Sequence, residues 1–154
     1  MIPSFGIGIL LLTFVLALYG VFAAVYGARK NSMAWVESAR LAMLLTFPLL
    51  LLASLALIYL MVNDRFDVAY VFEVVSRSMP LGLKITALWG GQAGSILFWS
   101  LTMSGFASAV TLRKWSRDRE FLPWVIAVSL ATLAFFVGLS VFAENPFAQI
   151  WELP

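Results

Sequence analysis

The 154-residue sequence contains neither cysteine nor histidine. Without cysteine the chain has no disulfide, no thiolate ligand for a metal ion and no cysteine nucleophile. Without histidine it lacks the commonest general base, the commonest zinc ligand and the usual axial ligand of haem iron. We therefore expect this chain to contribute no catalytic residue, no metal ligand and no cofactor ligand of its own.

Charged residues are also scarce, at 12% of the chain, whereas hydrophobic residues make up 62%. Soluble domains contain about 25% charged and about 45–50% apolar residues. The composition therefore predicts an integral membrane protein whose first partner is the lipid bilayer. The net charge of +2 is too small to suggest a nucleic-acid partner.

Four apolar runs are long enough to cross a bilayer, which takes about 20 helical residues. They predict an all-α fold, a polytopic membrane helix bundle with four transmembrane helices, in a single module of residues 1–154. The predicted spans are residues 5–28, 41–62, 91–112 and 121–143. An outer loop covers 63–90. Its last part, from 81 to about 89, is expected to lie in the membrane interface, because a helix over 81–112 would be roughly 48 Å long.

No predicted span carries a charged residue near its centre. Ionisable residues within a bilayer usually mark ion or proton pathways. Because the spans lack them, we disfavour the hypothesis that this chain is half of a transporter. Asp64 and Asp67 in the outer loop have the spacing of a metal-binding pair. No third ligand accompanies them, and solvated loop charges are the interpretation that we favour.

Lysine and arginine are distributed unevenly between the two sides of the predicted bundle. The connections at 29–40 and 113–120 carry seven of these residues, and the other side carries three. Short loops rich in Lys and Arg favour the cytoplasmic side of a membrane. We therefore predict that both termini and the outer loop lie outside.

One stretch, residues 84–99, combines features that the other apolar runs lack. The adjacent Gly90 and Gly91 allow the backbone to bend or to take a positive φ, and a Gly-Ser pair further on allows another helix to approach closely. We expect the Gln92 amide to cap local backbone groups. A tightly packed helix start at the interface is favoured over a docking or substrate-facing surface. The candidate packing or partner-docking residues are Lys84, Trp89, Gly90, Gly91, Gln92, Gly94, Ser95 and Trp99.

Three runs in this region resemble a known family. They are Asp67-Val-Ala-Tyr-Val, Ser76-Arg-Ser-Met-Pro and Lys84-Ile-Thr-Ala-Leu-Trp-Gly-Gly-Gln-Ala-Gly-Ser-Ile-Leu-Phe-Trp. They are similar to the amino-terminal part of cytochrome c maturation protein F (CcmF), a haem-handling family. The resemblance covers essentially the whole chain but only the first part of a typical member. We therefore expect the front part of a longer or split protein.

The resemblance implies a membrane module of a haem lyase, which attaches haem to apocytochrome c on the outer face of the membrane. Haem itself would be bound by segments absent here, because the family's Trp-rich segment and haem-ligating histidines lie further along its chain. Family members often carry His-Glu after the glycine pair, where this chain has Gln92-Ala93.

The implied partners are the remainder of the lyase, a haem chaperone and the membrane subunits that present apocytochrome. The implied location is a bacterial cytoplasmic membrane or an organellar inner membrane. The alternative hypothesis, from a different functional class, is that the chain is a small structural subunit of a respiratory or photosynthetic electron-transfer complex. Co-purification separates the two, since the first predicts maturation proteins and the second predicts electron-transfer subunits.

Overall fold

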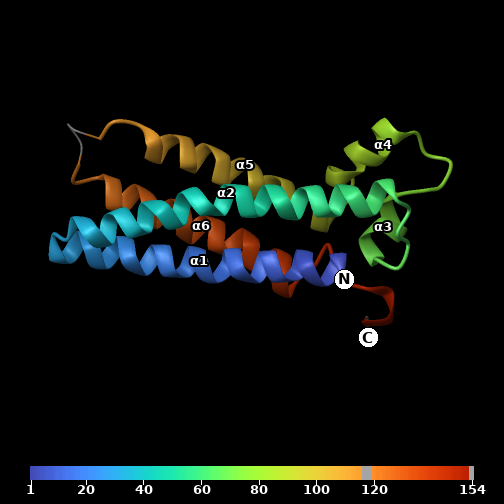
Figure 1. The fold of residues 1–154 in the computed structure, drawn as a ribbon, viewed down its shortest axis with the longest axis horizontal. Coiled ribbons are helices and arrows are strands. Elements are labelled where there is room, and N and C mark those ends of the chain that lie inside the picture. Colours follow the sequence, from blue (N-terminus) through green and yellow to red (C-terminus); the bar gives the residue numbers. More distant parts are fainter. Residues whose placement is uncertain (116–118, 153–154) are drawn as a thin grey trace.

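The computed structural model describes residues 1–115 and 119–152. Four long helices run side by side (Figure 1), and each is long and apolar enough to cross a membrane. They are α1 (Ile2–Lys30), α2 (Met33–Val62), α5 (Gln92–Leu112) and α6 (Leu122–Phe142). The predicted all-α membrane bundle is confirmed, and the chain is a multi-pass membrane protein.

The four helices close into a ring, in which α1 packs on α2 and α6, and α5 packs on α2 and α6. Small residues line the first of these contacts, and Ala17, Gly20 and Ala24 of α1 are all buried. A Cβ atom on Gly20 would lie 3.3 Å from the Cβ of Ala42 and would collide with Leu130. Close backbone approach therefore holds α1 against its neighbours, as is usual where lipid competes with apolar side chains.

Buried serines follow one face of α5, and they bond to carbonyls both within and between helices. Ser100 and Ser104 donate to carbonyls of their own helix, at 2.8 Å each. Ser108 reaches across to the carbonyl of Met43 on α2, at 3.4 Å. Each hydroxyl is thereby satisfied within the apolar bundle, as is usual for serine in membrane helices.

The short elements lie between α2 and α5, at the end of the bundle that also holds both termini (Figure 1). They are α3 (Ala69–Val74), α4 (Leu81–Thr86) and the 3-10 helix η1 (Ala87–Trp89), and a second 3-10 helix, η2 (Ile150–Glu152), ends the described chain. We call residues 63–91 and 143–152 together the cap. Val68, just before α3, forms one isolated antiparallel bridge with Gln149.

The helices at the opposite end extend further than the predicted spans. Residues 29–40 were expected to form a polar connection, but α1 continues to Lys30 and α2 already begins at Met33. Asn31 has a left-handed φ of 51° between them. Glu37 and Arg40 are tolerated in the first turns of α2 because they pair with each other at the membrane boundary. In the other connection, 113–120, residues 116–118 lie outside the described residues.

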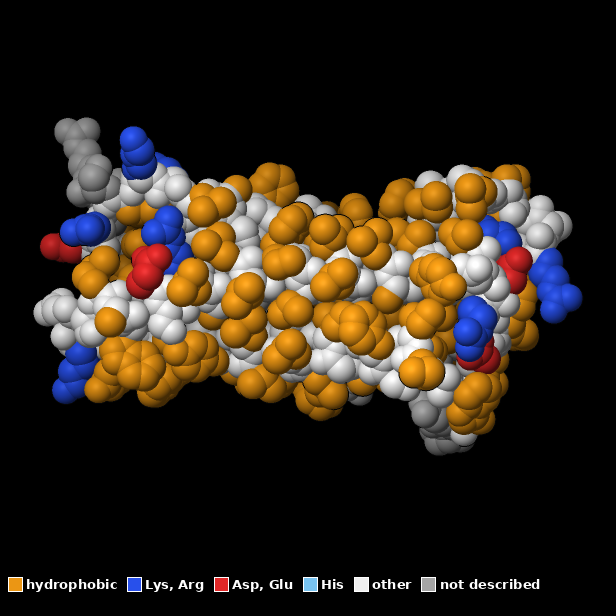
Figure 2. Space-filling view, viewed as in Figure 1, with side chains coloured by type: hydrophobic (Ala, Val, Ile, Leu, Met, Phe, Trp, Pro, Cys, Tyr) orange, Lys and Arg blue, Asp and Glu red, His pale blue; other side chains and the backbone are white. Residues whose placement is uncertain are grey.

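The surface has the distribution of side chains that a bilayer requires. Figure 2 shows a broad apolar belt over the middle of the molecule, with Lys, Arg, Asp and Glu gathered towards its two ends. Large side chains such as Phe22, Leu55 and Phe135 are more than half exposed in this belt. In water such a surface would drive aggregation, whereas acyl chains solvate it well.

Candidate functional site at the capped end

Tyr70 of α3 joins three elements of the cap. The side chain is 4% exposed, and its hydroxyl oxygen lies 3.0 Å from the carbonyl oxygens of both Ala87 and Leu88. The same oxygen accepts a hydrogen bond from the backbone N–H of Gly91, at 3.1 Å. Burial raises the pKa of Tyr70 above its ordinary value, so the hydroxyl keeps the proton that it shares between the two carbonyls. One side chain thus connects α3, η1 and the start of α5.

The glycines of this region make room for that tyrosine. A Cβ atom on Gly91 would lie 2.8 Å from Cε2 of Tyr70, and one on Gly94 would collide with the Leu88 carbonyl oxygen and the Tyr70 hydroxyl. Neither Gly90, with φ of −77°, nor Gly91, with φ of −128°, has the positive φ that the sequence allowed. Gly91 and Gly94 are therefore required because a larger side chain would not fit beside Tyr70, and not because of their backbone conformation.

Lys84 and Asp64 form the most enclosed ion pair of the described residues. The Lys84 ammonium lies 2.5 Å from a carboxylate oxygen of Asp64, and the two side chains are 8% and 32% exposed. Asp64 follows α2 with φ of 52°, a left-handed conformation that Asp adopts more readily than most residues. The pair therefore anchors α4 to the end of α2. On α4 the usual polarity is reversed, since Lys84 is buried while Leu81 and Leu83 are exposed.

The two loop aspartates are not free solvated charges, because each is paired with a different basic side chain. Asp67 accepts two hydrogen bonds from Arg65, at 2.9 and 2.8 Å, and that guanidinium lowers the pKa of the Asp67 carboxyl. Asp64 forms the ion pair with Lys84 described above. Among the described residues, no group of three or more His, Cys, Asp or Glu could hold a metal ion.

The remaining candidate residues lie around the start of α5 and have separate roles. Ser95 donates to the carbonyl of Trp89, at 3.1 Å, which satisfies a backbone acceptor where η1 ends. The Trp89 ring contacts Phe98 with 5.3 Å between centroids. Trp89 and Trp99 are 50% and 63% exposed. α5 begins at Gln92 with Gly91 as its N-cap and no side-chain cap bond, so the structure does not show the local cap expected of Gln92.

The segment after α6 completes the cap, which the sequence analysis did not anticipate. The N–H of Ala69 donates to the carbonyl of Ala148 at 2.9 Å, and the N–H of Ile150 donates to the carbonyl of Asp67 at 3.0 Å. Phe147 is fully buried against Gly6 of α1, where a Cβ atom would collide with the ring. Phe147, in an aromatic and mildly acidic tail, was the available signal for this docking.

The described polar groups inside the cap take part in packing contacts. Its buried polar groups, the Tyr70 hydroxyl and the Lys84–Asp64 pair, are already satisfied by groups within the cap. Several exposed side chains at this end are large and apolar, among them Phe72, Leu81, Leu83, Trp89 and Trp99. Such a surface suits lipid or another membrane protein.

Comparisons with known proteins identify similar chains. No protein-family model matches the sequence. The cytochrome c-type biogenesis protein ccl1 of Rhodobacter capsulatus is 30% identical over 154 residues, which cover all of this chain and 24% of ccl1. The cytochrome c-type biogenesis protein CcmF of Pseudomonas aeruginosa is 31% identical over 150 residues, which cover 97% of this chain and 23% of that protein.

The fold is also similar to that of a solved structure, the cytochrome c heme lyase CcmF. The TM-score is 0.89 at 26% sequence identity, over 96% of this chain and 25% of the solved chain. The chain spans about a quarter of the length of these relatives. The resemblance to the amino-terminal part of CcmF is thereby confirmed.

Proposed function

We propose that this chain is a membrane module of a haem lyase of cytochrome c biogenesis, which helps attach haem to apocytochrome c on the outer face of the membrane. The observation that carries the proposal is the similarity of both fold and sequence to a heme lyase along nearly the whole chain. The cap adds support, because two of the runs that resemble the family contain Tyr70, Lys84 and the glycines that hold the cap together.

The chain lacks the usual ligands of haem iron. With neither histidine nor cysteine in the chain, tyrosine and methionine remain as side chains that ligate haem iron. The Tyr70 hydroxyl is engaged with three backbone groups, and Met43 and Met61 are fully buried between helices. We therefore assign haem binding to other segments of the lyase, and we assign scaffolding and docking to this chain.

The partners that we propose are the remainder of the lyase, a haem chaperone and the membrane subunits that present apocytochrome. The outward side chains at the capped end, among them Trp99 at 63% exposure, are the proposed contact with the remainder of the lyase. We place the chain in a bacterial cytoplasmic membrane with the cap outside, where apocytochrome would receive haem. The bias of basic residues toward the other end supports this orientation.

Affinity purification of the tagged chain from its own membranes tests the proposed function. We expect cytochrome c maturation proteins and a haem-bearing partner to co-purify, and we expect Trp99→Ala to weaken that association. Trp124→Ala is the matched control, because Trp124 is also about half exposed, at 48%, but lies at the opposite end of the bundle. Stoichiometric electron-transfer subunits in place of maturation proteins would support the alternative, a structural subunit of an electron-transfer complex.

The orientation can be measured with single engineered cysteines, because the natural chain contains none. We expect Ser78→Cys, in the cap, to react with an impermeant maleimide from outside the membrane. We expect Ser32→Cys, between α1 and α2, to react only after the cytoplasmic face is opened. The reverse pattern would place the cap in the cytoplasm and would contradict the proposed role at the outer face.

A further inference from the structure

A groove opens at the end of the bundle opposite the cap, between the start of α2 and the end of α5. Its volume is about 610 Å³, which is within the range of roughly 300–1,000 Å³ typical of ligand sites. Of its described lining residues, four are basic and one is acidic. They are Arg40, Arg113, Lys114 and Arg119, with Glu37 as the carboxylate. The groove therefore has the charge of an anion site.

Arg40 has hydrogen-bonding capacity that the described residues do not use. Its Nη1 lies 3.4 Å from a Glu37 oxygen, a long contact to a side chain that is 51% exposed. Its Nε is buried and has no hydrogen-bond partner among the described residues. Buried donors are almost always satisfied in folded proteins, and this unpartnered donor belongs to a side chain that lines the groove.

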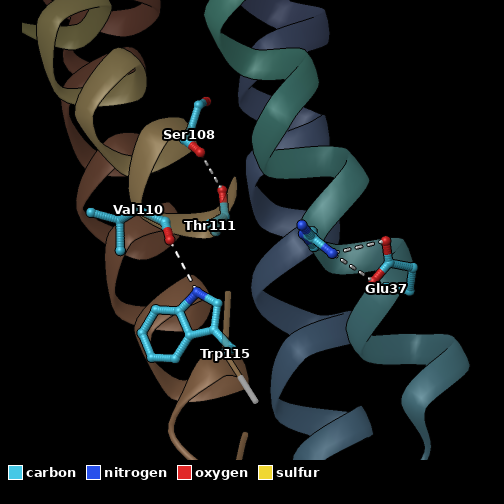
Figure 3. A network of polar contacts seen from close by, with 6 residues as sticks. Glu37, Ser108, Val110, Thr111 and Trp115 are labelled. Atoms are coloured by element: carbon cyan, nitrogen blue, oxygen red, sulfur yellow. Dashed lines mark hydrogen bonds and ion pairs between the residues drawn. The ribbon is translucent and has the colours of Figure 1, made fainter. Parts of the chain in front are cut away.

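The facing wall of the groove is held by Trp115. Its indole N–H donates to the carbonyl of Val110, at 3.0 Å, and the Arg113 guanidinium lies 5.5 Å from its ring centroid. Figure 3 shows Trp115 beyond the end of α5 and Glu37 on α2, on the two sides of the groove. Tryptophan favours the membrane–water boundary, and Leu112, also in the lining, is the last residue of α5. The groove therefore opens at the depth of lipid headgroups.

We propose that this groove binds the phosphate headgroup of an anionic phospholipid. Guanidinium groups bind phosphate oxygens with charge-assisted and often bidentate hydrogen bonds, and basic pockets at the ends of membrane helices suit anionic headgroups. The exposed Leu112 continues the groove wall toward the apolar belt, where the acyl chain of a bound lipid would lie. A free phosphate would use the basic groups but not this apolar continuation. The assignment is independent of the proposed haem lyase function.

The test compares lipids retained by the purified chain in native mass spectrometry. We expect phosphatidylglycerol to bind at least about tenfold more tightly than phosphatidylcholine, and we expect Arg40→Gln with Arg119→Gln to remove most of that preference, since it deletes two guanidinium contacts. Arg29→Gln with Lys30→Gln is the matched control. It removes the same charge at the same end from exposed side chains outside the groove, and it is expected to keep the preference.

Three results would overturn the proposal. They are equal retention of the two lipids, an equal loss in the control variant, and displacement of phosphatidylglycerol by millimolar glycerol phosphate, which would show a site for a free anion. If the Arg40 and Arg119 double variant does not fold, Lys114→Gln replaces it. Lys114 is exposed and lines the groove, and an unchanged lipid preference in this variant would also count against the proposal.

Discussion

Replacing Gly94 with alanine is expected to lower the free energy of unfolding by about 2–4 kcal/mol, which combines overpacking with broken hydrogen bonds. The added methyl group would collide with the Leu88 carbonyl oxygen and with the Tyr70 hydroxyl. The carbonyl belongs to the backbone and cannot rotate away, so η1 and α5 must separate. That movement would break the bonds from Tyr70 to Ala87 and Leu88. Denaturant unfolding in detergent, monitored by tryptophan fluorescence, measures the loss.

Gly82→Ala is the matched control for this prediction. Gly82 lies on α4, in the same cap, but a Cβ atom there would meet nothing within 4 Å. Since alanine favours a helix more than glycine does, by about 1 kcal/mol, this variant is expected to be neutral or slightly stabilising. Tyr70→Phe removes the hydroxyl without overpacking. Its free energy of unfolding should lie between those of Gly94→Ala and Gly82→Ala. Equal stability of Gly94→Ala and Gly82→Ala would show that the close approach at Gly94 does not hold the cap.

Replacing Asp64 with asparagine is expected to destabilise the cap by about 1–3 kcal/mol. This is less than the roughly 3–5 kcal/mol for a fully buried pair, because the Asp64 side chain is 32% exposed and water partly screens it. The change leaves the Lys84 ammonium enclosed beside a neutral amide. Asparagine also adopts the left-handed conformation of Asp64, so backbone strain does not contribute. Denaturant unfolding measures the change.

Lys84→Met serves as the comparison for Asp64→Asn. It removes the buried charge and keeps an apolar side chain of similar length, while the remaining carboxylate can reach water. We expect it to cost less than Asp64→Asn, and we expect the double variant to resemble Lys84→Met alone. Such non-additivity is what a double-mutant cycle reports for two residues in contact. A larger loss for Lys84→Met than for Asp64→Asn would show that the lysine side chain acts by packing and not as a paired charge.

The membrane-spanning architecture could be predicted from the sequence because hydropathy is a local property. A run of about 20 apolar residues meets the length condition for a span on its own, whatever it packs against. The sequence also singled out the glycine-rich stretch at 84–99 and favoured a tightly packed helix start there. The continuity of α2 from Met33 through the predicted span at 41–62 was not visible, since a helix in a membrane continues past the apolar run into charged turns such as that of Glu37 and Arg40.

The sequence by itself determined that this protein is an all-α membrane bundle without histidine or cysteine chemistry, because composition and apolar run length decide both. Only the tertiary structure decided which residues hold the cap. Tyr70 meets residues 17 to 21 positions away, Lys84 meets Asp64 at a separation of 20, and the tail after α6 pairs with the segment before α3. These residues meet because their helices and loops pack together in space. Helical or strand periodicity in the sequence gives no information about contacts between residues so far apart.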